Sequence, residues 1–188
     1  MSEAKAEKAA RPNRRPVHRR VVACDAYQRD DGLFDVEATV TDTKPFPLGL
    51  PMRVVPADSP LHQMTLRLAV DRQYVIHEVE VRTEHAPYHT CYPIGDRYQK
   101  LIGLAIGPGF MRSVRGLFGG ALGCTHLTEL LGPISTVVFQ ALWSEVGIDG
   151  WKRGQSPVGH CLALAPGAEI TQRHFSHLVI DKAGESGA

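Results

Sequence analysis

Several patterns that would mark a familiar function are missing from this sequence of 188 residues. It has four cysteines but no Cys-x-x-Cys pair, which excludes the usual zinc ribbon and a thioredoxin-like dithiol. No run reaches the roughly 18 apolar residues of a membrane span, and no apolar secretory segment follows the N-terminus. The glycine-rich segments match neither a P-loop nor the dinucleotide fingerprint. We therefore expect a cytoplasmic protein without membrane contact and without a nucleotide cofactor.

The chain also lacks an excess of charge of either sign, since its net charge is +1. The charged residues are nevertheless unevenly distributed along it. Residues 1–20 carry +5 and the remainder carries −4. The near-balance of the whole chain disfavours nucleic acid as a partner. The first 16 residues lack large apolar side chains after Met1, so they cannot repay the entropy of ordering. We expect a disordered basic arm over 1–17, a single domain over 18–180 and a frayed tail over 181–188.

The first half of the chain predicts antiparallel strands. A β-rich run over 19–28 is followed by a turn sequence, and apolar and polar residues then alternate over 34–41. Two further alternating runs lie at 64–70 and 75–82. The proline-rich connection over 44–60 is longer than most loops, which is typical of a lid or binding loop.

The second half predicts helices that cover this sheet. A capping box at Asp96 indicates one start, and an apolar stripe over 110–118 a second helix. Leucine and valine at spacings of three and four predict the main helix over 125–142, kinked or broken at Pro133. A short strand is expected at 160–164 and a last helix over 169–180. The fold class is α+β, an antiparallel β-meander of about four strands with helices packed on one face.

Cys124 and His126 stand at the start of the main predicted helix, behind glycines that could let both side chains converge. Glu129 follows three residues later and can orient the imidazole from the same face. His62, at the entry to a strand, is the candidate general acid or base. The alternative is that Cys124 is a small buried side chain and His62 a strand-edge histidine.

A second group, His89 and Cys91, follows the fourth predicted strand. Their spacing of two lets both point to one side of an extended loop. If this loop meets the main helix, the metal ligands would be Cys91, Cys124 and His126 with His89 or Glu129. Such a sulfur, nitrogen and oxygen set suits zinc or iron. The alternative to a metal site, which the sequence supports equally, is that His89 is a surface histidine and Cys91 a buried cysteine.

Five segments of the sequence form a specific combination, namely Arg29–Ala38, Asp42–Lys44, Pro60–Met64, Gly107–Phe110 and Gly123–Leu131. Through these segments the chain resembles a bacterial family, the domain-of-unknown-function family numbered 2889, over roughly residues 18–178. The resemblance implies no particular activity.

A more distant likeness is to the scaffold proteins of iron–sulfur cluster assembly. Like them, the chain has a β-meander, a cysteine in the next loop, helices and a late cysteine-containing turn. Cys91 and Cys124 fall at comparable places, whereas the scaffolds' middle cysteine has no counterpart here. This likeness concerns the fold alone.

These features favour an enzyme acting on a small molecule, with a Cys/His-centred site that can bind zinc or iron. Lyase or hydrolase chemistry on an aromatic or acyl compound, as in aromatic compound catabolism, fits the lack of redox-cofactor motifs. A non-catalytic metal or iron–sulfur carrier is the first alternative, and a partner-binding module the second. The sequence is compatible with a homo-oligomer.

Overall fold

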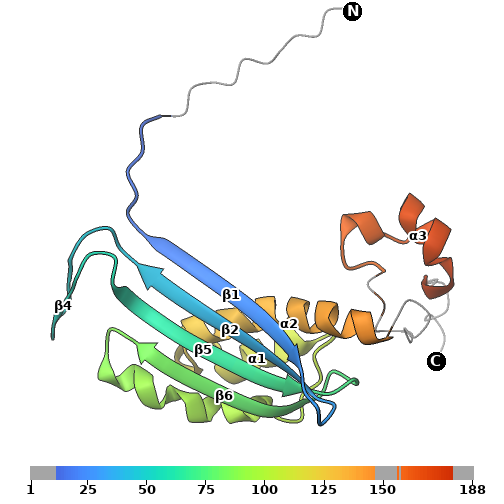
Figure 1. Ribbon diagram of the computed structural model, residues 1–188, viewed down its shortest axis with the longest axis horizontal. Coiled ribbons are helices and arrows are strands. Elements are labelled where there is room, and N and C mark those ends of the chain that lie inside the picture. Colours follow the sequence, from blue (N-terminus) through green and yellow to red (C-terminus); the bar gives the residue numbers. More distant parts are fainter. Residues whose placement is uncertain (1–11, 147–155, 157, 180–188) are drawn as a thin grey trace, which may run out of the picture.

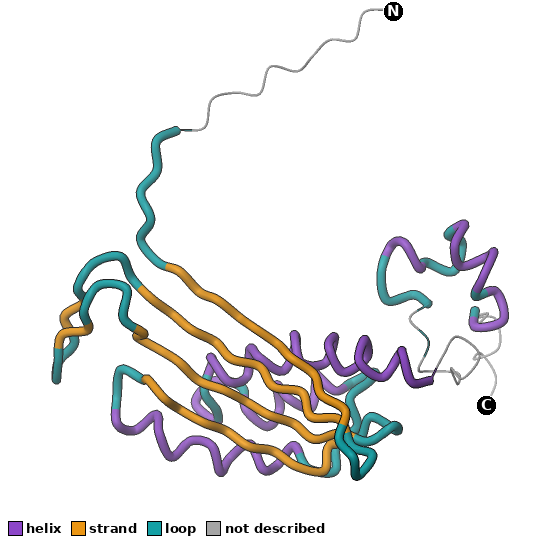
Figure 2. The backbone as a smooth tube through the Cα atoms, in the orientation of Figure 1, coloured by secondary structure: helices purple, strands orange, loops and turns teal. Residues whose placement is uncertain are grey.

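A computed structural model describes residues 12–146, 156 and 158–179 of the chain. The predicted basic arm and C-terminal tail therefore lie largely outside the described residues. Residues 12–18 run as an exposed, irregular lead into the first strand (Figures 1 and 2). No helix in the described ranges is long and apolar enough to cross a membrane.

Four antiparallel strands form the main sheet in the order β1-β2-β5-β6, as the alternating sequence predicts. Two short strands, β3 and β4, pair with each other in an arm that extends beyond the sheet (Figure 1). Since the arm is only an excursion between neighbouring strands, the sheet is a meander. The strands are β1 (Arg19–Gln28), β2 (Phe34–Thr43), β3 (Leu48–Gly49), β4 (Val54–Val55), β5 (Pro60–Val70) and β6 (Ile76–His85).

Helices cover one face of the sheet (Figure 1). The long α2 contacts β1, β2 and β5, and the 3-10 helix η1 packs along β6. The helices are η1 (His89–Leu101), α1 (Phe110–Phe118), η2 (Gly120–Leu122), α2 (Thr125–Val146), η4 (Leu162–Leu164), α3 (Glu169–His174) and η5 (Ser176–Leu178).

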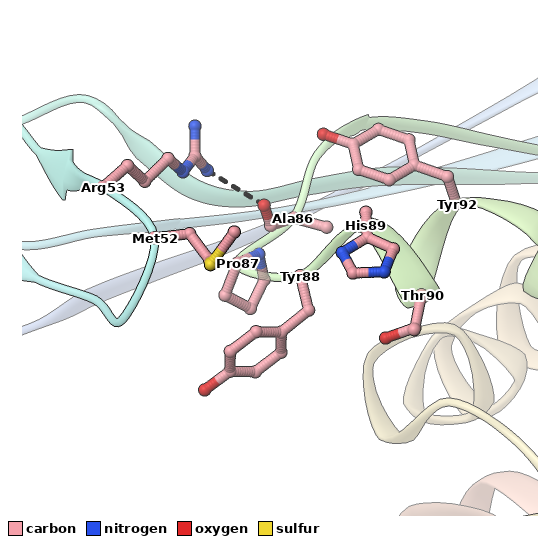
Figure 3. A pocket seen from close by; sticks show the side chains of 8 residues that line it. All are labelled: Met52, Arg53, Ala86, Pro87, Tyr88, His89, Thr90 and Tyr92. Atoms are coloured by element: carbon pink, nitrogen blue, oxygen red, sulfur yellow. Dashed lines mark hydrogen bonds between the residues drawn. The ribbon is translucent and has the colours of Figure 1, made fainter.

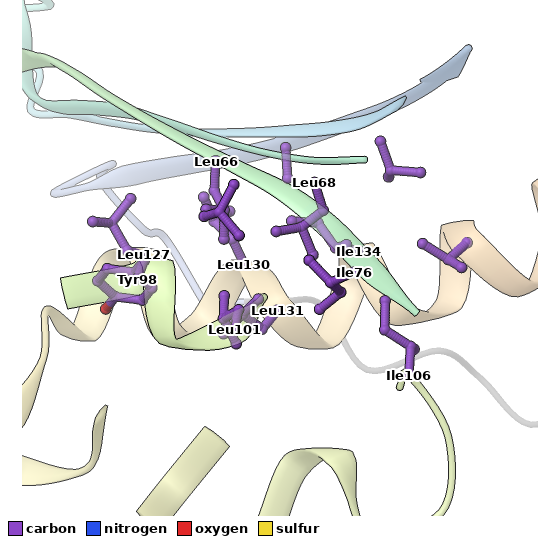
Figure 4. Close-up of a cluster of buried hydrophobic side chains, with 14 of the residues drawn as sticks. Leu66, Leu68, Ile76, Tyr98, Leu101, Ile106, Leu127, Leu130, Leu131 and Ile134 are labelled. Carbon is purple, nitrogen blue, oxygen red and sulfur yellow. The ribbon is translucent and has the colours of Figure 1, made fainter. Parts of the chain in front are cut away.

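The core lies between the sheet and these helices (Figure 4). Every second residue of β2 is buried, which is the period that a strand with one covered face requires. Aliphatic side chains from α2 meet those of β5, and Tyr98 of η1 is fully buried among them. The largest members of this core are Met64, Leu66, Leu68, Ile76, Tyr98, Leu101, Leu127, Leu130, Leu131, Ile134 and Leu142.

Four local expectations differ from the structure. The last helix, expected over 169–180, is divided in its described part into α3 and the 3-10 helix η5. The helix expected to begin at Asp96 is η1, which already begins at His89. The expected capping box does not form, because Gln99 donates to the Val79 carbonyl of β6 (2.9 Å). The α2 helix runs through Pro133 without a break. Residues 162–164 form a 3-10 turn rather than a strand, and the exposure of Leu162 shows that no neighbouring strand covers them.

Candidate metal centre

Three polar side chains form a row across the helix-covered face at one end of the sheet. Asp42 of β2 is paired with Arg20 of β1 on one side and with His62 of β5 on the other. Asp42 continues the buried alternation of Val36, Ala38 and Val40, and only 1% of its side chain is exposed. The sheet register therefore places a buried carboxylate between a guanidinium and an imidazole.

His126 covers this row from the first turn of α2. Its ring stacks on that of His62, with the ring centroids 3.7 Å apart. Its Nε2 lies 3.4 Å from Oδ2 of Asp42, and Nδ1 of His62 lies 3.2 Å from the same oxygen. Two imidazole nitrogens thus converge on one carboxylate oxygen.

Arg20 holds Asp42 in place through two hydrogen bonds. Its Nε donates to Oδ1 (2.8 Å) and its Nη2 to Oδ2 (2.9 Å). His18 Nε2 also contacts Oδ1 (3.1 Å), and Glu129 Oε2 accepts a bond from Nη1 of Arg20 (2.5 Å). A carboxylate offers about four lone-pair sites, so Oδ2 retains one that faces the two imidazoles.

The protonation states of the three central groups follow from these contacts. Burial lowers the pKa of His62 to about 4, and the positive charges of His126 and Arg20 act in the same direction. Burial, followed by the charge of Arg20, also lowers the pKa of His126. Burial alone would raise the pKa of Asp42, but the hydrogen bonds and charge of Arg20 outweigh it and the pKa is lowered. At neutral pH the group holds two neutral imidazoles and one carboxylate, the forms that bind a metal ion.

The geometry of Asp42, His62 and His126 fits a divalent ion. Each offers a ligand atom, and the three atoms lie within 4.8 Å of one another. Ligands about 2.1 Å from one ion are about 3.0 Å apart at a right angle and about 3.4 Å apart at the tetrahedral angle. The two imidazole-to-carboxylate distances, 3.2 and 3.4 Å, fall in this range.

A buried nitrogen without a hydrogen-bond partner supports the same conclusion. Nδ1 of His62 is shielded from solvent and has no hydrogen-bond partner among the described residues. An unsatisfied buried polar atom is costly unless another ligand completes it. A cation between His62, His126 and Asp42 would bind that lone pair.

Cys124 directly precedes α2, in a turn fixed by Tyr98. The Tyr98 hydroxyl accepts a bond from the Cys124 amide (3.0 Å), contacts the Cys124 carbonyl (2.9 Å) and contacts Oγ1 of Thr128 (2.8 Å). Gly123 permits the turn, because a Cβ there would lie 2.7 Å from Cβ of Phe118. The Cys124 sulfur lies 3.9 Å from Nδ1 of His126 and 3.9 Å from Sδ of Met64. The sulfur thus contacts one ring nitrogen of His126 and Asp42 contacts the other.

The structure brings together some of the predicted site residues and separates others. His62 and His126 meet, and Glu129 reaches them through Arg20 rather than by orienting the imidazole directly. Within the described ranges, the metal-ligand group that forms around His126 contains neither Cys91, Cys124 nor His89. Cys91 packs against the apolar core, and His89 lines a separate pocket (Figure 3). The expected ligand set is thus not assembled, because η1 places these two residues along β6.

Asp42, Arg20 and His18 are the site residues that the sequence reasoning missed. A signal for Asp42 was present, since it falls on the buried phase of the β2 alternation, where a carboxylate needs a charged partner. His62 similarly precedes the buried Met64 and Leu66 at the same period.

The comparisons with known proteins identify a family. The family model described as "Protein of unknown function (DUF2889)" matches residues 18–140, a range that includes His18, Asp42, His62 and His126. No curated protein and no solved structure matches the chain. Because the family model spans well over half of the 188 residues, the chain belongs to the DUF2889 family.

Proposed function

We propose that this protein is a metal-dependent enzyme acting on a small molecule, with a zinc or iron(II) ion held by Asp42, His62 and His126. The observation that carries the proposal is the convergence of two neutral imidazoles on one oxygen of a buried carboxylate. Two histidines and one carboxylate are a recurrent ligand set of catalytic zinc and non-haem iron sites.

The number of ligands favours catalysis over storage or transport. Structural zinc sites usually have four protein ligands, whereas catalytic sites keep a position for water or substrate. In the part of the chain that the structure describes, three residues form the group, and the His62 and His126 side chains are 14% and 20% exposed. A bound ion would supply Lewis acidity and lower the pKa of a bound water, which suits hydrolase or lyase chemistry.

The surrounding residues have supporting functions in this proposal. Arg20 orients the Asp42 carboxylate, and Glu129 offsets the positive charge of Arg20 beside the ion. Tyr98 fixes the turn before α2 and so positions His126. Outer contacts of this kind commonly change metal affinity or activity by about 10- to 100-fold.

The test combines metal binding with turnover of a simple ester. Zinc is titrated calorimetrically into metal-free protein, and the zinc-loaded protein is assayed with 4-nitrophenyl acetate, which reports metal-activated water. We expect one zinc per chain and ester hydrolysis above the metal-free rate, both lost in His62→Ala and His126→Ala. His77→Ala is the matched control, because His77 is exposed and pairs with Asp71. Stoichiometric zinc without any rate enhancement would favour a carrier, and unchanged zinc binding in both variants would refute the site.

A further inference from the structure

A pocket of about 440 Å³ lies between the β3–β4 arm and the segment that follows β6 (Figure 3). The arm contributes Met52 and Arg53, and the segment contributes residues 86–90 and Tyr92. A hydrogen bond from Nη2 of Arg53 to the Ala86 carbonyl (2.9 Å) joins the two sides. The volume is within the range of about 300–1,000 Å³ typical of small-molecule sites.

The lining combines apolar and aromatic surface with positive charge. Met52, Tyr88 and Tyr92 are among the exposed large apolar side chains, at 81%, 49% and 48%. Arg53 is the arginine of the lining, and none of the described lining residues is acidic. An arginine has five N–H donors, so the bond to Ala86 leaves most of the guanidinium available to a ligand.

The pocket and the candidate metal centre lie at the same end of the sheet. The arm joins the ends of β2 and β5 that carry Asp42 and His62. The other wall begins at Ala86, directly after His85, and His85 pairs with Gln63, the neighbour of His62. Sheet register thus places the pocket beside the strand ends that supply two of the three proposed metal ligands.

We propose that this pocket binds a small aromatic carboxylate. The carboxylate would pair with Arg53, a geometry for which the planar guanidinium is well suited. The ring would pack against Tyr88, Tyr92 and the Met52 thioether, which favour flat apolar partners.

The charge and the ring can be tested separately with three probes on metal-free, ¹⁵N-labelled protein. Benzoate carries both features, benzyl alcohol lacks the charge and hexanoate lacks the ring. We expect saturable amide shifts at residues 52–53, 86 and 88–92 with benzoate, and affinities at least about tenfold weaker for the other two probes. Arg53→Met should reduce benzoate affinity about tenfold and leave benzyl alcohol unchanged. Arg112→Met, an exposed arginine of α1 outside the lining, is the matched control.

Several results would overturn the proposal. No saturable shift with benzoate, or equal binding of benzyl alcohol, would remove the carboxylate site. Equal binding of hexanoate would assign an acyl ligand instead. Shifts centred on Arg20 and His126 would place the anion at the other site. His62→Ala should bind benzoate as the parent protein does, so loss of the metal site and loss of this pocket are distinguishable.

Discussion

Asp42 and His62 are directly opposite each other in the β2–β5 ladder, with Oδ2 of Asp42 3.2 Å from Nδ1 of His62. The pairing fixes both residues through backbone register, so their approach does not depend on a flexible loop. His126 adds a third group from a different element, and its ring is held by stacking on His62. Three separate segments therefore determine the geometry of the candidate metal centre.

Replacing Asp42 with Asn should destabilise the metal-free protein by roughly 2 kcal/mol. The change leaves Arg20 beside a neutral group. The loss is smaller than for a fully buried ion pair, because the Arg20 side chain is 35% exposed. Urea unfolding of metal-free protein measures the effect. Asp31→Asn is the control, since Asp31 forms an exposed pair with Arg29 and its loss should matter much less. Equal losses of unfolding free energy in the two variants would show that the Asp42–Arg20 pair stabilises the protein no more than an exposed pair does.

Metal-free protein should lose stability as the pH falls from about 6.5 to about 4. His62 has a folded-state pKa of about 4 and an unfolded value near 6.5, so the unfolded chain binds its proton first. The stability from neutral His62 is complete above pH 6.5 and is lost as the pH falls to about 4. Chemical denaturation across this window should show a steeper decline for the parent protein than for His62→Gln, by on the order of 3 kcal/mol in total. Parallel curves would contradict the lowered pKa.

The fold was predictable from the sequence because its main signals are local. Alternation over 34–41 and 64–70 reports a sheet with one covered face, and the apolar period over 125–142 reports a helix on that face. The boundary of η1 was not predictable in the same way. Gln99 bonds to the β6 carbonyl of Val79, a tertiary contact that the capping pattern around Asp96 does not reveal.

The site was half predictable for a related reason. His62 and His126 stood out by residue type, but Asp42 appears on the sequence as the last step of a strand. Its meaning depends on the register that pairs it with Arg20 and His62. Conversely, the sequence predicts Cys91 as a metal ligand, whereas in the structure η1 packs it against the core.

Neither cysteine singled out by the sequence should be needed for metal binding. Cys91→Ser and Cys124→Ser should both retain one zinc per chain, because neither sulfur belongs to the ligand group among the described residues. Cys124→Ser is compared with His126→Ala, which removes the adjacent ligand and should lose the metal. Elemental analysis of the loaded variants after gel filtration measures this. Loss of zinc in Cys91→Ser would contradict this prediction and support the thiolate ligand set expected from the sequence.

Tyr98→Phe should destabilise the protein by about 1–2 kcal/mol and weaken metal binding by about tenfold. The substitution keeps the buried ring but leaves the Cys124 amide without its hydroxyl acceptor, which loosens the turn that positions His126. Thermal unfolding and zinc titration measure the two effects. Tyr88→Phe, on a half-exposed ring, should change neither. A stable Tyr98→Phe protein with unaltered zinc affinity would show that this hydroxyl does not position the site.

X-ray absorption at the zinc edge of the zinc-loaded protein tests the central claim most directly. We expect a first shell of nitrogen and oxygen at about 2.0–2.2 Å, with outer scattering from two imidazoles and no sulfur near 2.3 Å. In His62→Ala the bound zinc, and with it the absorption signal, should be lost. A sulfur shell near 2.3 Å, or a spectrum unchanged by His62→Ala and His126→Ala, would contradict a metal centre built from Asp42, His62 and His126.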